Sequence, residues 1–128
     1  MEQKNIIMVV DDEYDMVDLI QLVLQTEGYD VITATSGKTA LEKLKTEKPD
    51  LILLDVSMPD LDGWQVIKKI KENSGLKSIP IIMVTAKAQS TDKIMGLHIL
   101  NADDYITKPF GRQELLNSVK KYLEASVV

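Results

Sequence analysis

Five side chains at the ends of apolar runs are of the types that phosphoryl transfer to a carboxylate needs. Asp11 and Asp12 follow the first apolar run, Asp55 closes the third, Thr85 closes the fourth, and Lys108 follows the fifth. Carboxylates that lie close together repel one another unless a cation joins them, and an all-oxygen set of ligands suits Mg²⁺ or Mn²⁺. Beside such an ion a carboxylate can attack phosphorus to form an acyl phosphate, while an ammonium and a hydroxyl group bind the phosphoryl oxygens.

Each of these residues also has an ordinary structural explanation. An Asp-Asp pair after a strand often caps a helix, and the aspartate at position 55, close to a proline, could simply open a turn. Thr85 could pack within its strand, and Lys108 could be an exposed loop residue. Chemistry is favoured because all five residues are expected at the same edge of the fold, whereas unrelated loop residues would be scattered over both edges.

Five short apolar runs alternate along the chain with segments of helical periodicity. The runs occupy 6–10, 31–34, 51–54, 81–84 and 105–106. The first, third and fourth are continuously apolar, which is typical of strands that are buried on both faces. The first helical segment is expected to end at Gly28, the second to begin after Ser36, and the third to end at 73–75. The fourth is expected to run from about 90 to 100, and the fifth carries an apolar stripe over 115–123.

Alternating strands and helices imply parallel strands joined by right-handed crossovers, with helices on both faces of the sheet. We therefore expect a doubly wound α/β fold of the flavodoxin-like type, with three αβα layers, a five-stranded parallel sheet and five helices. In such a sheet, ligands bind beyond the carboxyl ends of the strands, near the point where the strand order reverses. That rule places the five polar residues together.

Composition limits the remaining possibilities. A chain of 128 residues predicts one domain over 1–128, with an ordered core at about 5–124. The lack of cysteine excludes disulfide scaffolds, thiolate zinc sites and cysteine nucleophiles. The net charge of −5 argues against direct binding to nucleic acid. The first apolar run is too short for a signal peptide or a membrane span, so we expect a cytoplasmic protein that does not bind membranes.

Four motifs around these residues resemble those of the response-regulator receiver domains of two-component signalling, the single-domain fold of the chemotaxis type. They are Val-Val-Asp-Asp-Glu at 9–13, Leu-Leu-Asp-Val-Ser-Met-Pro-Asp-Leu-Asp-Gly at 53–63, Val-Thr-Ala at 84–86 and Ala-Asp-Asp-Tyr-Ile-Thr-Lys-Pro-Phe at 102–110. The motifs follow the family's order and spacing, and the resemblance spans essentially the whole chain.

The resemblance implies that Asp55 is the phosphoacceptor. It implies that Asp11, Asp12 and Asp55 hold Mg²⁺ together with the backbone carbonyl of Ser57. Asp12 is favoured as the direct ligand of the pair. The ion is expected to be Mg²⁺, with Mn²⁺ as the substitute that the same oxygen ligands would accept.

Other matched positions receive supporting roles from the resemblance. Thr85 and Lys108 are expected to contact the phosphoryl oxygens, and the bond between Lys108 and Pro109 is expected to be a cis peptide. Thr85 and Tyr105 form the expected switch pair, in which the Tyr105 side chain turns inward as Thr85 moves; ordinary strand packing is the other interpretation of Tyr105. Ser57 and Lys87 occupy positions that tune the lifetime of the acyl phosphate.

The chain departs from the family pattern in one place. The stretch between Thr85 and Lys108 is one residue longer than the pattern, and the usual Gly-Ala reads Asn101-Ala102 here. Asn is the next best residue after Gly for a left-handed turn, so the turn itself can form. The register of the fourth helix, and with it the partner surface, depends on how the extra residue before Asp103 is accommodated.

The function implied by the resemblance is a phosphorylation-driven switch, with self-directed chemistry rather than enzymatic turnover. A histidine kinase or phosphotransfer protein supplies the phosphoryl group, and the face made by the fourth helix, fifth strand and fifth helix binds an unidentified protein target. Three alternatives remain. The chain could be a receiver cut from a larger regulator or hybrid kinase, or an adaptor that works without phosphorylation. It could also be a phosphohydrolase with an aspartyl-phosphate intermediate, which needs a second carboxylate where this chain has Ser57.

Overall fold

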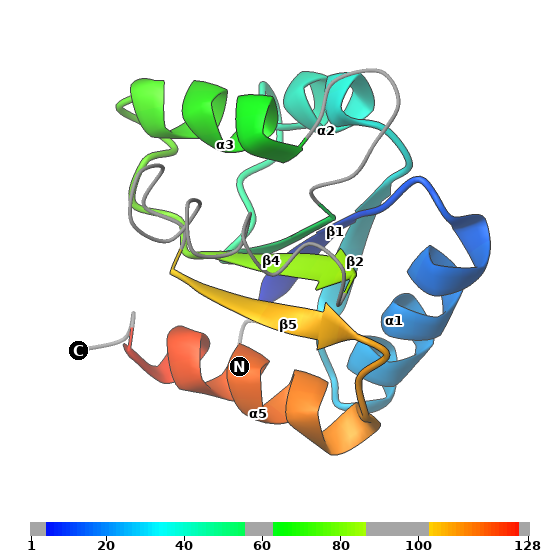
Figure 1. Ribbon diagram of the computed structural model, residues 1–128. Coiled ribbons are helices and arrows are strands. Elements are labelled where there is room, and N and C mark those ends of the chain that lie inside the picture. Colours follow the sequence, from blue (N-terminus) through cyan, green and yellow to red (C-terminus); the bar gives the residue numbers. More distant parts are fainter. Residues whose placement is uncertain (1–4, 56–62, 87–102, 126–128) are drawn as a thin grey trace.

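The five predicted strands form one parallel sheet. The computed structural model of the chain describes residues 5–55, 63–86 and 103–125, with positions 64, 85, 86 and 125 described by their backbone alone (Figure 1). The strands are β1 (Ile6–Val10), β2 (Asp30–Ala34), β3 (Leu51–Asp55), β4 (Ile81–Ala86) and β5 (Asp104–Lys108). Their order in the sheet is β2-β1-β3-β4-β5, and every neighbouring pair is parallel. The predicted doubly wound fold is confirmed.

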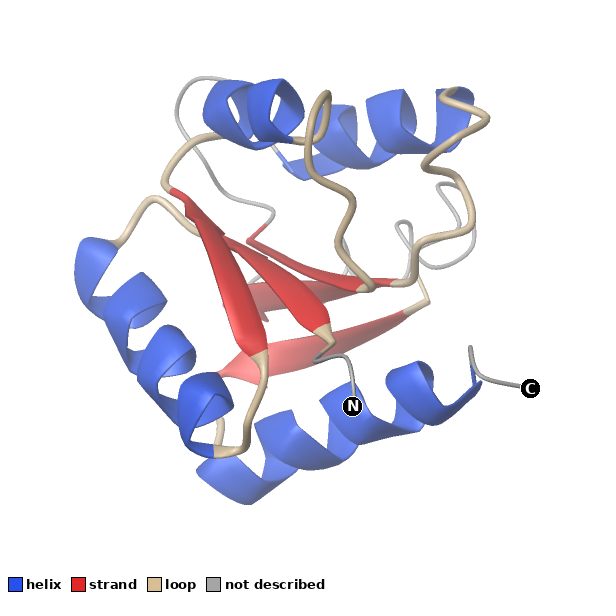
Figure 2. Cartoon of the chain, turned by 180° about the vertical axis from the view of Figure 1, so that it is seen from behind, coloured by secondary structure: helices blue, strands red, loops and turns tan. Residues whose placement is uncertain are grey.

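Helices cover both faces of this sheet. The described helices are α1 (Tyr14–Thr26), α2 (Gly37–Lys43), α3 (Gly63–Glu72) and α5 (Arg112–Ala125). Figures 1 and 2 show α2 and α3 on one face and α1 and α5 on the other, which gives the three expected layers. The predicted fourth helix, at about 90–100, lies outside the described residues.

The continuously apolar strands reflect this double coverage. Along β1, Met8 and Val10 belong to the core under α2 and α3, whereas Ile7 and Val9 belong to the core under α1 and α5. The residues of β3 alternate in the same way. Successive side chains of a strand point to opposite faces, so a strand covered on both sides must be apolar at every position.

Local signals begin and end the helices as predicted. Gly28 follows α1 with a φ of 90°, a left-handed conformation that glycine adopts without a steric penalty. The Ser36 hydroxyl accepts a hydrogen bond from the Thr39 amide at 3.1 Å and so caps the first turn of α2. None of the described helices combines the length and apolar sequence that crossing a bilayer would require.

The fifth strand is longer than its predicted extent. The sequence predicted 105–106, but β5 spans Asp104–Lys108 and pairs along that length with β4. The full length of β5 could not be predicted from its apolar residues. A strand at the sheet edge is held by backbone pairing and does not need an apolar side chain at every position. Lys108 is therefore the last residue of β5, and Thr85 lies one residue before the end of β4.

Candidate functional site

The sheet topology brings the predicted carboxylates together. The chain leaves β1 to form β2 on one side and later forms β3 on the other, so the strand order reverses between β1 and β3. The last paired residues of these two strands are Val10 and Leu54. Asp11 directly follows β1 and Asp55 is the last residue of β3, and adjacent strands lie about 4.8 Å apart. The reversal point therefore carries two acidic side chains side by side.

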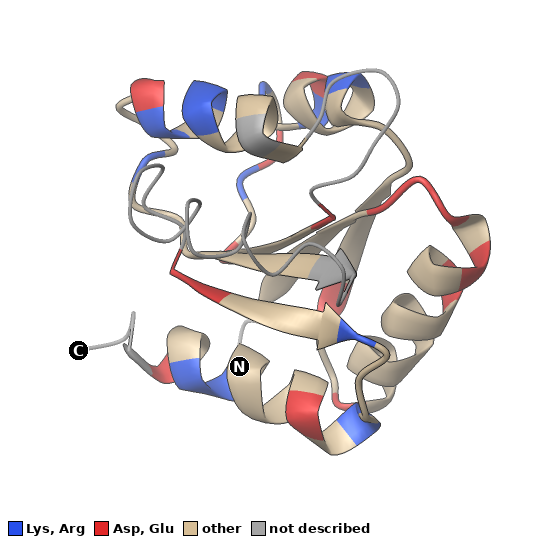
Figure 3. Cartoon of the chain, in the orientation of Figure 1, with Lys and Arg blue, Asp and Glu red and all other residues tan. Residues whose placement is uncertain are grey.

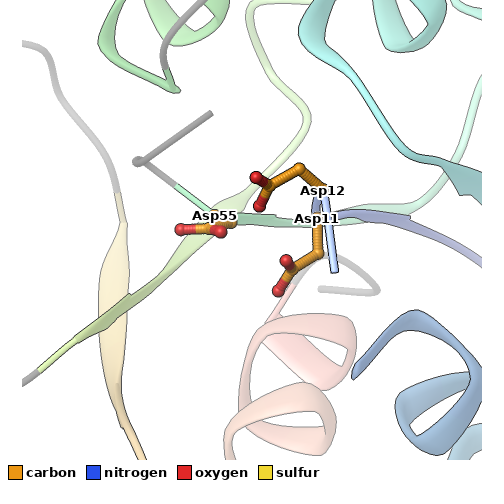
Figure 4. A group of neighbouring side chains, drawn as sticks. All are labelled: Asp11, Asp12 and Asp55. Carbon is orange, nitrogen blue, oxygen red and sulfur yellow. The ribbon is translucent and has the colours of Figure 1, made fainter. Parts of the chain in front are cut away.

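Three carboxylates converge at this point (Figure 4). Asp11, Asp12 and Asp55 each offer one oxygen atom, and these atoms all lie within 4.8 Å of one another. Asp11 and Asp55 are buried, with exposed fractions of 1% and 4%, whereas Asp12 is only half-buried. Burial strengthens the repulsion between negative charges because less water surrounds them.

The Lys108 ammonium group lies against the carboxylates. Its Nζ is 2.9 Å from Asp11 Oδ2 and 3.6 Å from Asp55 Oδ2. It also lies 3.1 Å from Glu13 Oε1, at the exposed side of the site. One ammonium group is therefore shared among three carboxylates that come from two separate segments of the chain.

The surroundings of Lys108 keep it positively charged. Burial alone would lower the pKa of the Lys108 ammonium, because a charged group loses hydration. The hydrogen bond to Asp11, the charges of Asp55 and Asp11, and the hydrogen bond to Glu13 outweigh that loss and raise the pKa above its ordinary value. Lys108 is accordingly protonated across the neutral range and available to bind an anionic group.

Asp11 and Asp12 differ in what they bind. Asp11 Oδ1 accepts a hydrogen bond from the Glu13 amide at 2.9 Å, and Asp11 Oδ2 accepts from Lys108. Asp12 accepts no hydrogen bond from the part of the chain that the structure describes. Both oxygens of Asp11 are thus occupied, whereas the half-buried Asp12 has oxygens that a cation could bind.

The donor set fits a hard divalent cation. Three carboxylates and one ammonium group leave the cluster with excess negative charge, and all the acidic ligand atoms are oxygens. Mg²⁺ prefers oxygen ligands and is commonly held by a small number of carboxylates that leave positions for water and phosphate. Asp11, Asp12 and Asp55 would hold the ion, which would supply charge neutralisation for a phosphoryl group.

Other predicted site residues are placed only in part. Thr85 pairs through its backbone with Thr107 in the β4–β5 ladder, and its side chain lies outside the described atoms. Ser57 and Lys87 fall outside the described residues. The Lys108–Pro109 peptide bond is cis. Tyr105 lies on β5 with 39% of its surface exposed.

Glu13 was not predicted as a site residue. It belongs to the motif at 9–13, but no pattern of apolar neighbours identifies it as part of the site. Its contact with Lys108 joins positions 95 apart in sequence. The only available signal was adjacency to Asp11 and Asp12, which does not reveal which way an exposed side chain points.

Comparisons with known proteins find similar sequences and similar folds. The sequence pattern described as the response regulator receiver domain matches residues 7–120. The chain is 50% identical over 122 residues to the alkaline phosphatase synthesis transcriptional regulatory protein PhoP of Bacillus subtilis. That match covers 95% of this chain and 50% of PhoP, so the chain spans about half the length of this relative.

Solved structures show the same similarity. The chemotaxis response regulator CheY4 of Vibrio cholerae superposes with a TM-score of 0.87 at 30% identity, over 94% of this chain and 99% of that one. The receiver domain of a signal transduction histidine kinase from Syntrophus aciditrophicus gives a TM-score of 0.87 at 31% identity, over 94% and 91% of the two chains.

Proposed function

This chain belongs to the family of response regulator receiver domains, and we propose that its switch is driven by phosphorylation of Asp55. Receiver domains are signalling domains rather than enzymes of metabolic turnover. The observation that carries the assignment of Asp55 is its position: it ends β3, is 4% exposed, and has Lys108 Nζ 3.6 Å from its Oδ2.

The residues around Asp55 have complementary tasks in this proposal. Its carboxylate oxygen attacks the phosphorus of the donor. A phosphorus–oxygen bond to Asp55 forms, and the phosphorus–nitrogen bond to the leaving imidazole of the donor histidine breaks. Lys108 would move from Asp11 and Glu13 toward the incoming phosphoryl oxygens, a short shift because it already touches all three carboxylates. The Thr85 hydroxyl would meet another of those oxygens. An ammonium group that is already in place stabilises developing negative charge without reorganising water.

The metal-binding part of the proposal assigns the ion to Asp11, Asp12 and Asp55, together with the backbone carbonyl of Ser57. Asp12 is the favoured direct ligand because both oxygens of Asp11 are engaged by Glu13 and Lys108. When bound, Mg²⁺ would neutralise charge on the carboxylates and the phosphoryl group. Mn²⁺ has the same preference for oxygen and should substitute for it.

The switch is proposed to be read out through β4, β5 and α5. Thr85 on β4 pairs with Thr107 on β5, so a movement at Thr85 reaches the strand that carries Tyr105. Tyr105 is 39% exposed, so an inward turn would bury more of its side chain. Ser57 and Lys87 would tune how long the phosphoryl group persists.

The upstream partner follows from the family, and the downstream one does not. Receiver domains interact with histidine kinases, and we propose that such a kinase, or a phosphotransfer protein, phosphorylates Asp55 in the cytoplasm. PhoP is named a transcriptional regulatory protein, and this chain matches about half of it. We propose a protein target for the face of the fourth helix, β5 and α5, with no direct nucleic-acid contact by this chain.

Phosphorylation of the purified chain by a small donor tests the proposal. Incubation with phosphoramidate and MgCl₂, followed by intact-mass spectrometry, should add one labile phosphoryl group to the wild type and none to Asp55→Asn. Chelation of the metal should prevent the reaction. Asp50→Asn is the matched control, because Asp50 precedes β3 at the other end of the same strand. Equal phosphorylation of Asp55→Asn and the wild type would reject Asp55 as the acceptor.

A further inference from the structure

The layer formed by α2 and α3 has the opposite charge to the rest of the molecule. Residues 37–48 and 63–77 contain eight of the chain's 15 Lys and Arg residues but only three of its 20 Asp and Glu residues. Figure 3 shows lysine on both helices of this layer. A basic layer on an acidic protein attracts acidic partners to one face and repels them from the others.

A groove lies within this basic layer. It is a hollow of about 400 Å³ between α2, α3 and the turn that follows α3. Leu41, Leu44 and Leu76 line its floor. Leu41 and Leu76 are half-buried and pack on the core beneath the layer, and Leu44 is buried at 6% exposure. The floor can therefore remove a partner's apolar side chains from water.

The rim of the groove is basic. Lys38, Lys45 and Lys69 line it and are exposed. Lys45 pairs with Glu42 at 3.3 Å, but both side chains are more than half exposed, and such a pair contributes little and is readily exchanged. Within the described ranges, Lys69 has no ion-pair partner. Lys45 and Lys69 can therefore pair with carboxylates from outside the chain.

A second hollow extends the basic surface over the outer side of α3. It has a volume of about 260 Å³ and is lined by Gln65, Lys68, Lys69 and Glu72. Lys69 is common to both hollows, so the two form a continuous surface across the helix.

We propose that this α2–α3 groove binds an acidic amphipathic helix of a partner protein. The apolar side of that helix would lie on the three leucines, and its flanking Asp or Glu residues would pair with the lysines of the rim. Helices commonly bind in grooves through apolar anchors one turn apart, with charges at the edge that fix orientation and partner choice.

The shape and chemistry of the groove favour a peptide over other anions. Nucleic-acid backbones bind through clustered positive charge and gain nothing from the apolar floor that this groove has. A membrane surface requires exposed apolar residues that reach outward, whereas Leu44 is buried and Leu41 and Leu76 are half-buried. None of the groove residues belongs to the carboxylate cluster, so this proposal does not rest on the proposed phosphorylation.

A designed peptide tests the groove directly. The probe is a fluorescent helical peptide with leucine at positions i, i+3 and i+7 and glutamate on the flanking positions, titrated with the full chain in 0.15 M salt. We expect saturable binding with a dissociation constant below about 100 μM, and a loss of affinity of about tenfold or more for Lys45→Glu/Lys69→Glu. The amide signals of Leu41 and Leu76 should shift in NMR spectra on binding.

Matched controls separate the groove from general charge attraction. Lys120→Glu/Lys121→Glu makes the same charge change on exposed residues of α5 and should leave binding within about twofold. The proposal fails if the peptide does not bind, if both double variants bind alike, or if a peptide with lysine for glutamate binds equally well. It also fails if duplex DNA, anionic vesicles or a second copy of this chain occupies the groove more tightly than the acidic peptide.

Discussion

Aspartates at the two edges of the sheet have opposite surroundings. At the amino-terminal edge, Asp50 and Asp103 each precede a strand, and each accepts the backbone N–H of the first residue of the neighbouring strand. The Ile6 amide donates to Asp50 Oδ2 at 2.8 Å, and the Ile81 amide donates to Asp103 Oδ2 at 2.8 Å. In return, the Asp50 amide donates to the Ile6 carbonyl, and the Asp103 amide donates to the Ile81 carbonyl. These two aspartates are structural.

The aspartates at the carboxyl-terminal edge lie among different groups. Parallel strands present unpaired carbonyl groups there, which accept hydrogen bonds and cannot donate them to carboxylates. Within the described residues, Asp11 accepts a hydrogen bond from the Glu13 amide, and the Lys108 ammonium lies against both Asp11 and Asp55. The two aspartates that precede strands thus pair with backbone amides, whereas those that end or follow strands gather around an ammonium group.

The largest effect is expected from removing the Lys108 ammonium group at the carboxyl-terminal edge. Lys108→Gln leaves the buried Asp11 and Asp55 charges without their ammonium partner, which should lower the free energy of unfolding by about 3 kcal/mol in metal-free buffer. Urea denaturation measures the change. Lys120→Gln breaks only an exposed pair with Glu27 and should cost less than about 1 kcal/mol. Equal losses for the two variants would contradict the contrast between the edges.

The next effect concerns magnesium. At a Mg²⁺ concentration ten times its dissociation constant, the wild type should gain about 1.4 kcal/mol of stability, because only the folded chain gathers the three carboxylates. Asp12→Asn should lose that gain and be slightly more stable than the wild type without metal, since one of three repelling charges is removed. Thermal melts with and without MgCl₂ measure both. An undiminished magnesium gain in Asp12→Asn would show that Asp12 does not bind the ion.

A mutation at the amino-terminal edge should lower stability by an amount that does not depend on magnesium. Asp103→Ala removes the acceptor of the Ile81 amide and should lower the free energy of unfolding by about 1 kcal/mol, because that donor loses its bond. Denaturation should show the same loss with and without MgCl₂. A loss that magnesium restores would mean that the two edges are not functionally distinct.

The last effect, of about the same size, depends on pH. The Tyr122 hydroxyl lies 3.0 Å from the Asp103 carbonyl oxygen and from Asp104 Oδ2. Burial, the hydrogen bond to Asp104 and the charges of Asp104 and Asp103 raise the pKa of Tyr122 to about 12. The raised pKa means that the folded chain holds this proton more tightly than the unfolded chain. The stabilisation is therefore complete below about pH 10 and lost as pH rises through about 12.

Tyr122→Phe isolates this contribution. At pH 8 the variant should be less stable than the wild type by about 1 kcal/mol, and the difference should shrink between about pH 10 and pH 12. Denaturation curves at several pH values measure the difference. A gap between variant and wild type that stays constant across this range would exclude the titration of Tyr122 as its cause.

The fold and the placement of the carboxylates were predictable because both follow from patterns local in sequence. Continuous apolar runs revealed the central strands, and the rule for ligand sites in doubly wound sheets placed Asp11 beside Asp55. The extent of β5 was not predictable, because its pairing with β4 replaces the apolar signal.

Contacts between segments far apart in sequence could not be predicted either. The distances from Lys108 to Glu13 and from Asp103 to Ile81 depend on how strands far apart in sequence align. The motif at 102–110 included Asp103, but its bond to the first residue of β4 requires the β4–β5 register. Sequence therefore predicted which residues reach each edge, and the structure shows which donors they meet there.

The most direct test of the central claim is to locate the phosphoryl group. Borohydride reduces an aspartyl phosphate to homoserine, which tandem mass spectrometry identifies at its position in the sequence. After treatment with phosphoramidate and MgCl₂, the account predicts homoserine at position 55, with Asp50 and Asp103 unchanged. Homoserine at position 11 or 12, or at the amino-terminal edge, would contradict it.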